Sequence, residues 1–160
     1  MNSKQEKNLP GKDKVEDFSL FEPITIITIG EKMRKPELLA PAGNLENLKI
    51  AIIYGADAVY VGGEDFGLRA RAKNFTVKQL ETGIKFAHDR GKRVYLTLNI
   101  VPHNEDLSGL SDYLFKLKKL ALDAVIISDP GILMIVKEVL PDMELHLSTQ
   151  ANTTNYAAVN

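Results

Sequence analysis

From Lys35 onward, apolar residues follow two alternating patterns. Between short apolar runs, apolar residues recur every three or four positions, which is the spacing of one helix face. Such faces are formed by Leu45, Leu48 and Ile52, and by the equivalent positions of segments around residues 77–87, 107–121 and 132–139. The apolar runs predict five strands, at residues 37–40, 58–61, 93–100, 124–127 and 144–148. Strands joined by helices run parallel, so the order predicts repeated β-α units.

Polar residues mark the expected helix boundaries. Asn44 suits the N-cap of the first helix, and Thr76 with Gln79 forms the signature of a capping box for the second. Gly91 can end that helix in a left-handed turn. Pro130 suits the first turn of a later helix, with Ser128 or Asp129 as its cap. A further helix is expected near the end of the chain, capped by Asn152, Thr153 or Thr154.

Two α/β architectures fit this order: a doubly wound open sheet and a TIM-type barrel. In the third and fifth strands, polar or aromatic residues alternate with aliphatic ones, at Tyr95, Thr97, Asn99, His146 and Ser148. A barrel explains this alternation, because one side of each strand faces helices and the other faces the barrel axis. A complete barrel takes about 250 residues. We therefore expect residues 35–160 to be the N-terminal portion of a truncated (β/α)8 barrel, with about five parallel strands and four to five helices.

Residues 1–34 are polar and lysine-rich, and we expect a disordered or weakly structured leader. Gly30-Glu31-Lys32 precedes Met33, and its codons can form a ribosome-binding sequence. Translation from Met33 and a genuine extension from Met1 are both open.

Composition narrows the classes of function. The net charge is −1, so the chain as a whole lacks the positive charge that would attract nucleic acid or an anionic membrane. The chain has no cysteine, which excludes disulfides, cysteine nucleophiles and Cys-ligated zinc or iron–sulfur sites within it. No apolar run approaches the roughly 20 residues of a membrane helix. We expect a cytoplasmic soluble protein without a membrane partner and with no metal ligands in this chain.

In barrels, the active site lies at the carboxyl ends of the strands. The loop after the second strand is unusual there, because Arg69, Arg71 and Lys73 lie between Phe66 and Phe75. Arginine forks bind carboxylates and phosphates, and aromatic residues beside basic ones suit RNA bases. The alternative is that the arginines pair with the acidic residues that open the loop.

His146 and Asp129 are the candidates for catalysis, as general acid or base. The alternative for His146 is a buried structural role, and for Asp129 a role as helix cap. His103 is expected to contact substrate or to be solvated. Polar side chains near the strand ends predict substrate binding by Asn44, Arg69, Arg71, Asn74, Asn99, His103, Ser148, Gln150 and Asn152.

Four stretches of the chain resemble the collagenase-like peptidase family, family U32. They are KPELLAPAGNLENLKIAIIYGADAVYVGGEDFGLRARAKNF, LTLNIVPHNEDL, AVIISDPGILMIVKE and LHLSTQANTTNYAA, and they span about residues 35–160. The matching positions lie at the expected strand ends and include the candidate site residues. The resemblance implies a barrel but assigns no firm mechanistic role to any of these residues.

The resemblance implies two activities. The first is hydrolysis of peptide bonds in a peptide or protein substrate, with this chain as a fragment of the peptidase. The alternative is an RNA-modification factor for hydroxylation of tRNA or rRNA, with an iron–sulfur cluster held by cysteines beyond Asn160 and no cofactor within this chain. A third hypothesis is a nonfunctional gene fragment. The sequence leaves the oligomeric state open.

Overall fold

The computed structural model describes residues 35–64, 66 and 74–158. Within it, Pro36–Asn160 forms one compact unit. The expected leader at residues 1–34 lies outside the described residues, so its predictions are untested, as is the choice between Met1 and Met33.

Five parallel strands form one sheet in the order β1-β2-β3-β4-β5, so each strand pairs with the next one in the chain. The strands are β1 (Leu39–Ala42), β2 (Ala58–Gly62), β3 (Arg93–Leu98), β4 (Ala124–Ile127) and β5 (Glu144–Leu147). This sequential order is that of a barrel wall, whereas doubly wound sheets reverse their strand order at a switch point. The predicted partial barrel is thus confirmed.

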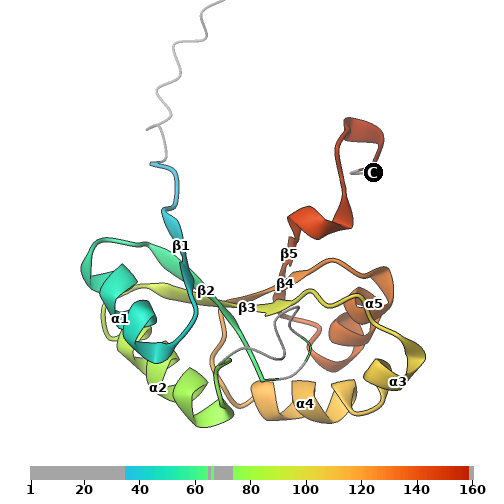
Figure 1. Ribbon diagram of the computed structural model, residues 1–160, viewed down its shortest axis with the longest axis horizontal. Coiled ribbons are helices and arrows are strands. Elements are labelled where there is room, and N and C mark those ends of the chain that lie inside the picture. The colour runs from blue at the N-terminus through green and yellow to red at the C-terminus, as the bar shows by residue number, and fades with distance from the viewer. Residues whose placement is uncertain (1–34, 65, 67–73, 159–160) are drawn as a thin grey trace, which may run out of the picture. The chain divides into compact units, whose positions relative to one another are not determined.

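The helices all lie on one side of the sheet (Figure 1). They are α1 (Leu45–Ile53), α2 (Val77–His88), α3 (Asn104–Leu107), α4 (Leu110–Leu117) and α5 (Pro130–Val139). Short 3-10 helices follow β5, η2 at Thr149–Ala151 and η3 at Tyr156–Ala158. In the described part of the chain, no helix packs on the other side of the sheet, which we call the axis face.

Strand alternation separates two sets of buried residues, as the sequence predicts. Aliphatic residues such as Val59, Leu96 and Val125 point to the helices and form the large core. On the axis face, Ala58, Tyr95 and Ala124 form a separate small cluster with Ile126 packed against it. Because successive side chains of a strand point to opposite faces, the remaining axis-facing positions follow from the register.

The sequence contains the triplet Asp-Ala-Val twice, at residues 57–59 and 123–125, and contacts of the two aspartates explain the repeat. The Asp57 carboxylate accepts a hydrogen bond from Leu38 N at 3.1 Å, just before β1, and Asp123 accepts one from Val94 N in β3 at 2.7 Å. Each aspartate also pairs with a basic side chain, Asp57 with Lys92 at 2.8 Å and Asp123 with His88 at 2.9 Å. Each aspartate therefore fixes the amino end of its own strand to the amino end of the preceding strand, β2 to β1 and β4 to β3. We call this arrangement the aspartate clamp.

Three expectations about the elements need correction. The first strand begins at Leu39 instead of Glu37, because Leu38 binds the Asp57 side chain and the ladder starts only at the pairing of Leu39 with Ala58. The third and fifth strands are shorter at their carboxyl ends than expected. The third expected helix is divided into α3 and α4, since Gly109 adopts a left-handed conformation with φ 93°.

The helix expected after Asn152 is present only as the short 3-10 helix η3, and its cap is Asn155, whose Oδ1 accepts from Ala158 N at 3.1 Å, in place of the expected Asn152, Thr153 or Thr154. Asn152 ends η2 in a left-handed conformation with φ 53° and therefore caps no following helix. Ser148 is the N-cap of η2, where its side chain accepts from Gln150 N. The other predicted caps are confirmed: Asn44 Oδ1 accepts from Asn47 N at 2.8 Å, and Thr76 and Gln79 form a capping box.

Among the described residues, no helix combines the length and the apolar character needed to cross a membrane.

Candidate functional site

The register of the sheet sets the height of each axis-facing residue. Tyr60, Tyr95, Ala124 and Glu144 lie at one level, because each is the partner of the next across the sheet. Gly62, Thr97, Ile126 and His146 form the next level toward the carboxyl edge. His146 therefore lies one level below the loops, where a barrel substrate would reach it.

His146 is held by two neighbours on this face. Its Nε2 lies 2.7 Å from Glu144 Oε1, and its ring meets the Tyr95 ring edge-on, with 4.7 Å between centroids and 74° between planes. An ionised carboxylate only accepts hydrogen bonds, so the contact favours the tautomer that carries its proton on Nε2. Nδ1 is then the ring nitrogen that can accept a proton. The prediction that His146 points to the axis is borne out by this geometry, while its catalytic role stays a prediction.

Tyr95 connects this histidine to the amino end of the sheet. It is only 1% exposed, and its hydroxyl donates to the two Glu37 carboxylate oxygens at 2.8 and 3.1 Å. Glu37 also forms an ion pair with Arg93. Burial raises the pKa of Tyr95 above its ordinary value of 10.0; the charges of Glu144 and Asp123 add to this rise, and Arg93 opposes it. The tyrosine is thus a neutral, fixed support for the His146 ring.

Asp129 is the N-cap of α5, which confirms the interpretation of this residue as a helix cap. Its Oδ1 accepts from Ile132 N at 2.9 Å. The side chain is half-buried, and it follows β4 at the carboxyl edge. The catalytic role of Asp129 stays a prediction beside its structural one.

The loop after β2 begins and ends at the carboxyl end of that strand. Gly63 forms a bridge with Phe75, and Phe75 N donates to Gly62 O at 3.0 Å. Phe75 is 2% exposed, and the Phe66 ring packs 5.4 Å from the Tyr113 ring, so aromatic residues anchor both ends. The predicted binding residues Arg69 and Arg71, with Lys73, lie outside the described residues.

Asn74 is brought to the axis face by this loop. A side chain on Gly62 would lie 3.4 Å from Asn74 Oδ1 and 3.7 Å from Thr97 Oγ1, so the three residues meet at the carboxyl end of β2 and β3. Thr97 Oγ1 donates to Val61 O at 3.1 Å. Asn99 follows β3 and is half-buried.

The other predicted binding residues lie in three different settings. Ser148 is 8% exposed and its backbone N donates to Ile127 O at 2.8 Å, which places it beside the end of β4. Asn44 is committed to capping α1. His103, Gln150 and Asn152 are exposed, and His103 N donates to Asp106 Oδ2 at 2.7 Å at the start of α3. Binding of substrate by any of these residues stays a prediction.

Sequence reasoning missed the partners of His146. Tyr95 and Glu144 point to the same face by strand alternation, and that signal could have placed them beside the histidine. Glu37 was assigned to the first strand, and its contact with Tyr95 depends on tertiary folding across three strands.

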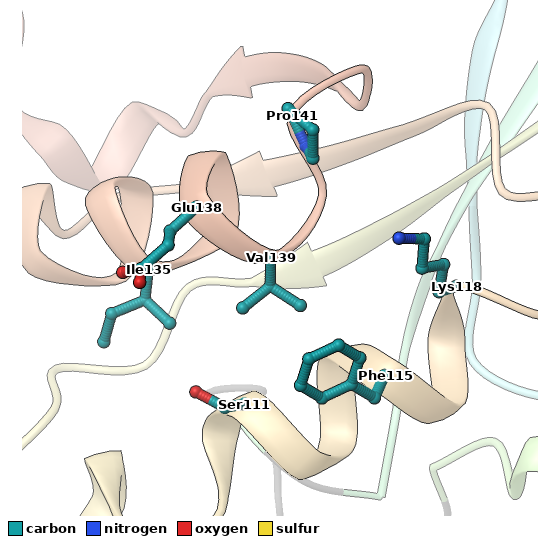
Figure 2. Close-up of a pocket in the computed structure, with 7 residues that line it drawn as sticks. All are labelled: Ser111, Phe115, Lys118, Ile135, Glu138, Val139 and Pro141. Atoms are coloured by element: carbon teal, nitrogen blue, oxygen red, sulfur yellow. The ribbon is translucent and has the colours of Figure 1, made fainter.

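A second surface feature lies among the helices. A groove of about 500 Å³ separates α4 from α5 and is lined by Ser111, Phe115, Lys118, Ile135, Glu138, Val139 and Pro141 (Figure 2). It lies on the helix side of the sheet and contains none of the predicted site residues.

The side chains present do not fit an iron–sulfur cluster. Such clusters need thiolate ligands, and the chain contains no cysteine. Within the described ranges, no group of three or more His, Asp or Glu residues could hold a metal ion. We therefore assign no step to a cluster in this chain.

The comparisons with known proteins agree with this barrel. The model of peptidase family U32 matches residues 43–160. The chain is 47% identical over 140 residues to tRNA hydroxylation protein P1 of Bacillus subtilis, covering 86% of this chain and 33% of that protein. It is 39% identical over 124 residues to a collagenase of Porphyromonas gingivalis, covering 77% of this chain and 30% of that protein.

A solved structure, the U32 peptidase Mk0906, superposes with a TM-score of 0.58 at 18% identity, over 73% of this chain and 50% of that one. This likeness concerns the fold. The chain spans about a third of the length of the two curated relatives.

Proposed function

Because this chain belongs to peptidase family U32, we propose that it forms the first part of the barrel of a protein that hydroxylates tRNA. The observation that carries the proposal is the 47% identity to tRNA hydroxylation protein P1 over 86% of the chain. The family model matches residues 43–160, a range that includes β2 to β5 and hence most of the axis face described above.

The chemistry of the carboxyl edge supports an RNA substrate. Asn74, Asn99 and Ser148 supply amide and hydroxyl groups near the strand ends. Such groups can donate to and accept from the edges of nucleobases, as they do in sequence-specific RNA recognition. Arg69 and Arg71 belong to the loop attached to the carboxyl end of β2, and we propose that they contact the phosphates.

Roles for His146 and Asp129 follow from their positions. His146 lies one level below the carboxyl edge with its Nε2 bound to Glu144, which leaves Nδ1 to take a proton. Asp129 lies at the end of β4 and has one oxygen bound to the helix backbone. We propose His146 as the general base and Asp129 as a group that orients the substrate.

Peptide hydrolysis is the second candidate, and the collagenase of Porphyromonas gingivalis favours it. A peptidase of the serine type pairs its histidine with a hydroxyl nucleophile. In the described part of the chain, His146 Nε2 contacts the Glu144 carboxylate, and Ser148 Oγ accepts from Gln150 N at 3.3 Å. Neither of these contacts is a pair of a histidine with a hydroxyl nucleophile. The identity to the tRNA hydroxylation protein is also higher, so hydroxylation is the better supported function.

Deletion of the gene in its host tests the proposal. We expect one or more hydroxylated nucleosides to disappear from digests of total tRNA analysed by mass spectrometry, and to return when the full-length gene is restored. An unchanged set of nucleosides in the deletion strain would overturn the proposal. Purified full-length protein incubated with gelatin tests the second candidate in parallel.

Variants of the restored gene test the site. His146→Gln is expected to lower the hydroxylated fraction at least tenfold, since general acid or base catalysis contributes about 100-fold or more. Phe115→Ala is a matched surface control, because Phe115 is 55% exposed in the groove on the helix side. Equal hydroxylation by both variants would remove His146 from the mechanism without affecting the assignment to tRNA.

A further inference from the structure

The surface shared by α1 and α2 carries two basic side chains around one aromatic ring. Arg90 Cζ lies 3.7 Å from the centroid of the Phe86 ring, and Lys49 Nζ lies 5.6 Å from the same centroid. Phe86 lies near the end of α2, Arg90 follows that helix, and Lys49 belongs to α1. We call these two basic residues the cation pair of Phe86.

Close packing of α1 on α2 brings the cation pair together. A methyl group on Gly83 of α2 would lie only 2.8 Å from Leu48 Cδ1 of α1. The glycine therefore lets the two helices approach closely, and they lie side by side in Figure 1. Phe86 and Lys49 follow Gly83 and Leu48 on their respective helices, so the ring and the lysine meet beside this contact.

The charges of the cation pair are not compensated by acidic groups. Among the ion pairs of the described residues, none includes Lys49 or Arg90. Asp89, the neighbour of Arg90 in the chain, is bound by Lys85 at 3.2 Å. The ring stabilises each cation, but their mutual repulsion persists, since both lie beside one ring and hence within about 10 Å, the Debye length at 0.1 M salt. An anion that contacts both groups would remove this repulsion.

The donor groups of the cation pair suit a phosphate. Arg90 Nη1 donates to Phe86 O at 3.0 Å, and the ring supports the guanidinium, so its position is fixed while further N–H groups remain for a ligand. A guanidinium binds phosphate oxygens as a fork, and an ammonium binds them as a point charge. Because the guanidinium is held in place before binding, less side-chain entropy is lost when the phosphate arrives.

The cation pair lies away from the carboxyl edge of the sheet. α2 begins beside that edge, just after Phe75 bridges to Gly63, and its 12 residues span about 18 Å toward the amino edge. A nucleic-acid duplex advances about 3.4 Å per base pair, so a stem of about five base pairs covers this distance. We propose that the cation pair of Phe86 binds the phosphate backbone of a tRNA stem whose target nucleotide lies at the carboxyl edge. This inference rests on the proposed function and adds a second contact surface for its substrate.

Salt-dependent binding of tRNA by the full-length protein tests the inference. The probe is total tRNA of the host labelled with a fluorophore, and fluorescence anisotropy gives the affinity at several salt concentrations. Each phosphate contact contributes about 0.7–0.9 to the slope of log affinity against log salt concentration. The double variant Lys49→Gln with Arg90→Gln is therefore expected to lower this slope by about 1.4–1.8, and the affinity at about 0.1 M salt about 25- to 60-fold.

A charge-matched control separates this site from general attraction. Lys116→Gln with Lys137→Gln removes the same two charges from exposed positions on α4 and α5, and it is expected to bind tRNA as the wild type does. Arg90→Lys keeps the charge but loses the fork, so it is expected to keep the slope and to weaken binding several-fold. Circular dichroism checks folding, and Lys49→Gln alone, with an expected slope change of about 0.7–0.9, replaces the double variant if that one does not fold.

The outcomes separate the inference from the proposed function. Equal slopes and affinities for the folded double variant and its charge-matched control overturn only the inference, as does a wild-type protein that binds no tRNA while hydroxylation still depends on the gene. Binding to vesicles of phosphatidylcholine and phosphatidylserine that depends on Lys49 and Arg90, without an effect on tRNA, also overturns it and assigns the pair to a membrane surface. If the deletion strain keeps its hydroxylated nucleosides while tRNA binding depends on the pair, the proposed function fails and the cation pair remains an RNA contact.

Discussion

The aspartate clamp at the amino end of β3 allows a quantitative prediction. Asp123 Oδ2 accepts from Val94 N at 2.7 Å and lies 2.9 Å from His88 Nε2. Asp123→Ala leaves the amide of Val94, a residue with 0% exposure, without this acceptor. An unsatisfied buried donor costs about 1–3 kcal/mol, and loss of the partly exposed histidine pair adds about 0.2–1 kcal/mol. We therefore expect a loss of about 1–4 kcal/mol in the free energy of unfolding.

Two further variants separate the contributions to this loss. Asp123→Asn keeps an oxygen that can accept from Val94 N and removes only the charge, so we expect a loss of about 1 kcal/mol or less. Asp89→Ala is the control, because Asp89 pairs with Lys85 on the surface, where the two side chains are 55% and 77% exposed. This control is expected to be neutral.

Urea denaturation of the purified protein, followed by circular dichroism, measures these free energies. Amide hydrogen exchange at Val94 gives a local measurement, and we expect faster exchange in Asp123→Ala than in Asp123→Asn. If Asp123→Ala is no less stable than Asp89→Ala, and Val94 exchanges at the wild-type rate, the clamp contributes nothing and the reasoning is refuted.

Three other predictions concern single positions. Gly63→Ala should lose about 1–3 kcal/mol of stability in urea, because the new methyl group would collide with the hydroxyl of buried Tyr113; wild-type stability would contradict this. Asn44→Asp should keep the stability of the protein, since Asp and Asn cap helices equally well, but should lower tRNA hydroxylation several-fold by repelling RNA; full activity would exclude Asn44 from binding. The raised pKa of Tyr95 means that its stabilising contribution is complete below pH 10 and is lost as the pH rises through the folded-state pKa. Melting temperatures measured from pH 9 to 11 should therefore fall less steeply in Tyr95→Phe than in the wild type, and equal slopes would contradict the assignment.

Local signals in the sequence determined most of the elements. Asn44, Thr76 with Gln79, and Asp129 with Pro130 begin helices as predicted, because a cap depends on residues three positions apart. Alternation along β3 and β5 predicted which side chains face the axis, since the period of a strand is fixed by its backbone. The barrel class followed from these patterns.

The tertiary structure decided what depends on distant segments. A residue expected to begin a strand can instead bind a side chain that is distant in sequence. Leu38 N donates to the Asp57 carboxylate, and β1 therefore begins one residue later. The site shows the same limit: His146 could be placed on the axis face from sequence, but its support by Tyr95, whose hydroxyl is bound to Glu37, joins residues up to 109 positions apart (146 − 37). Short-range patterns cannot specify such contacts, because they are fixed by the register of neighbouring strands and by packing across the sheet.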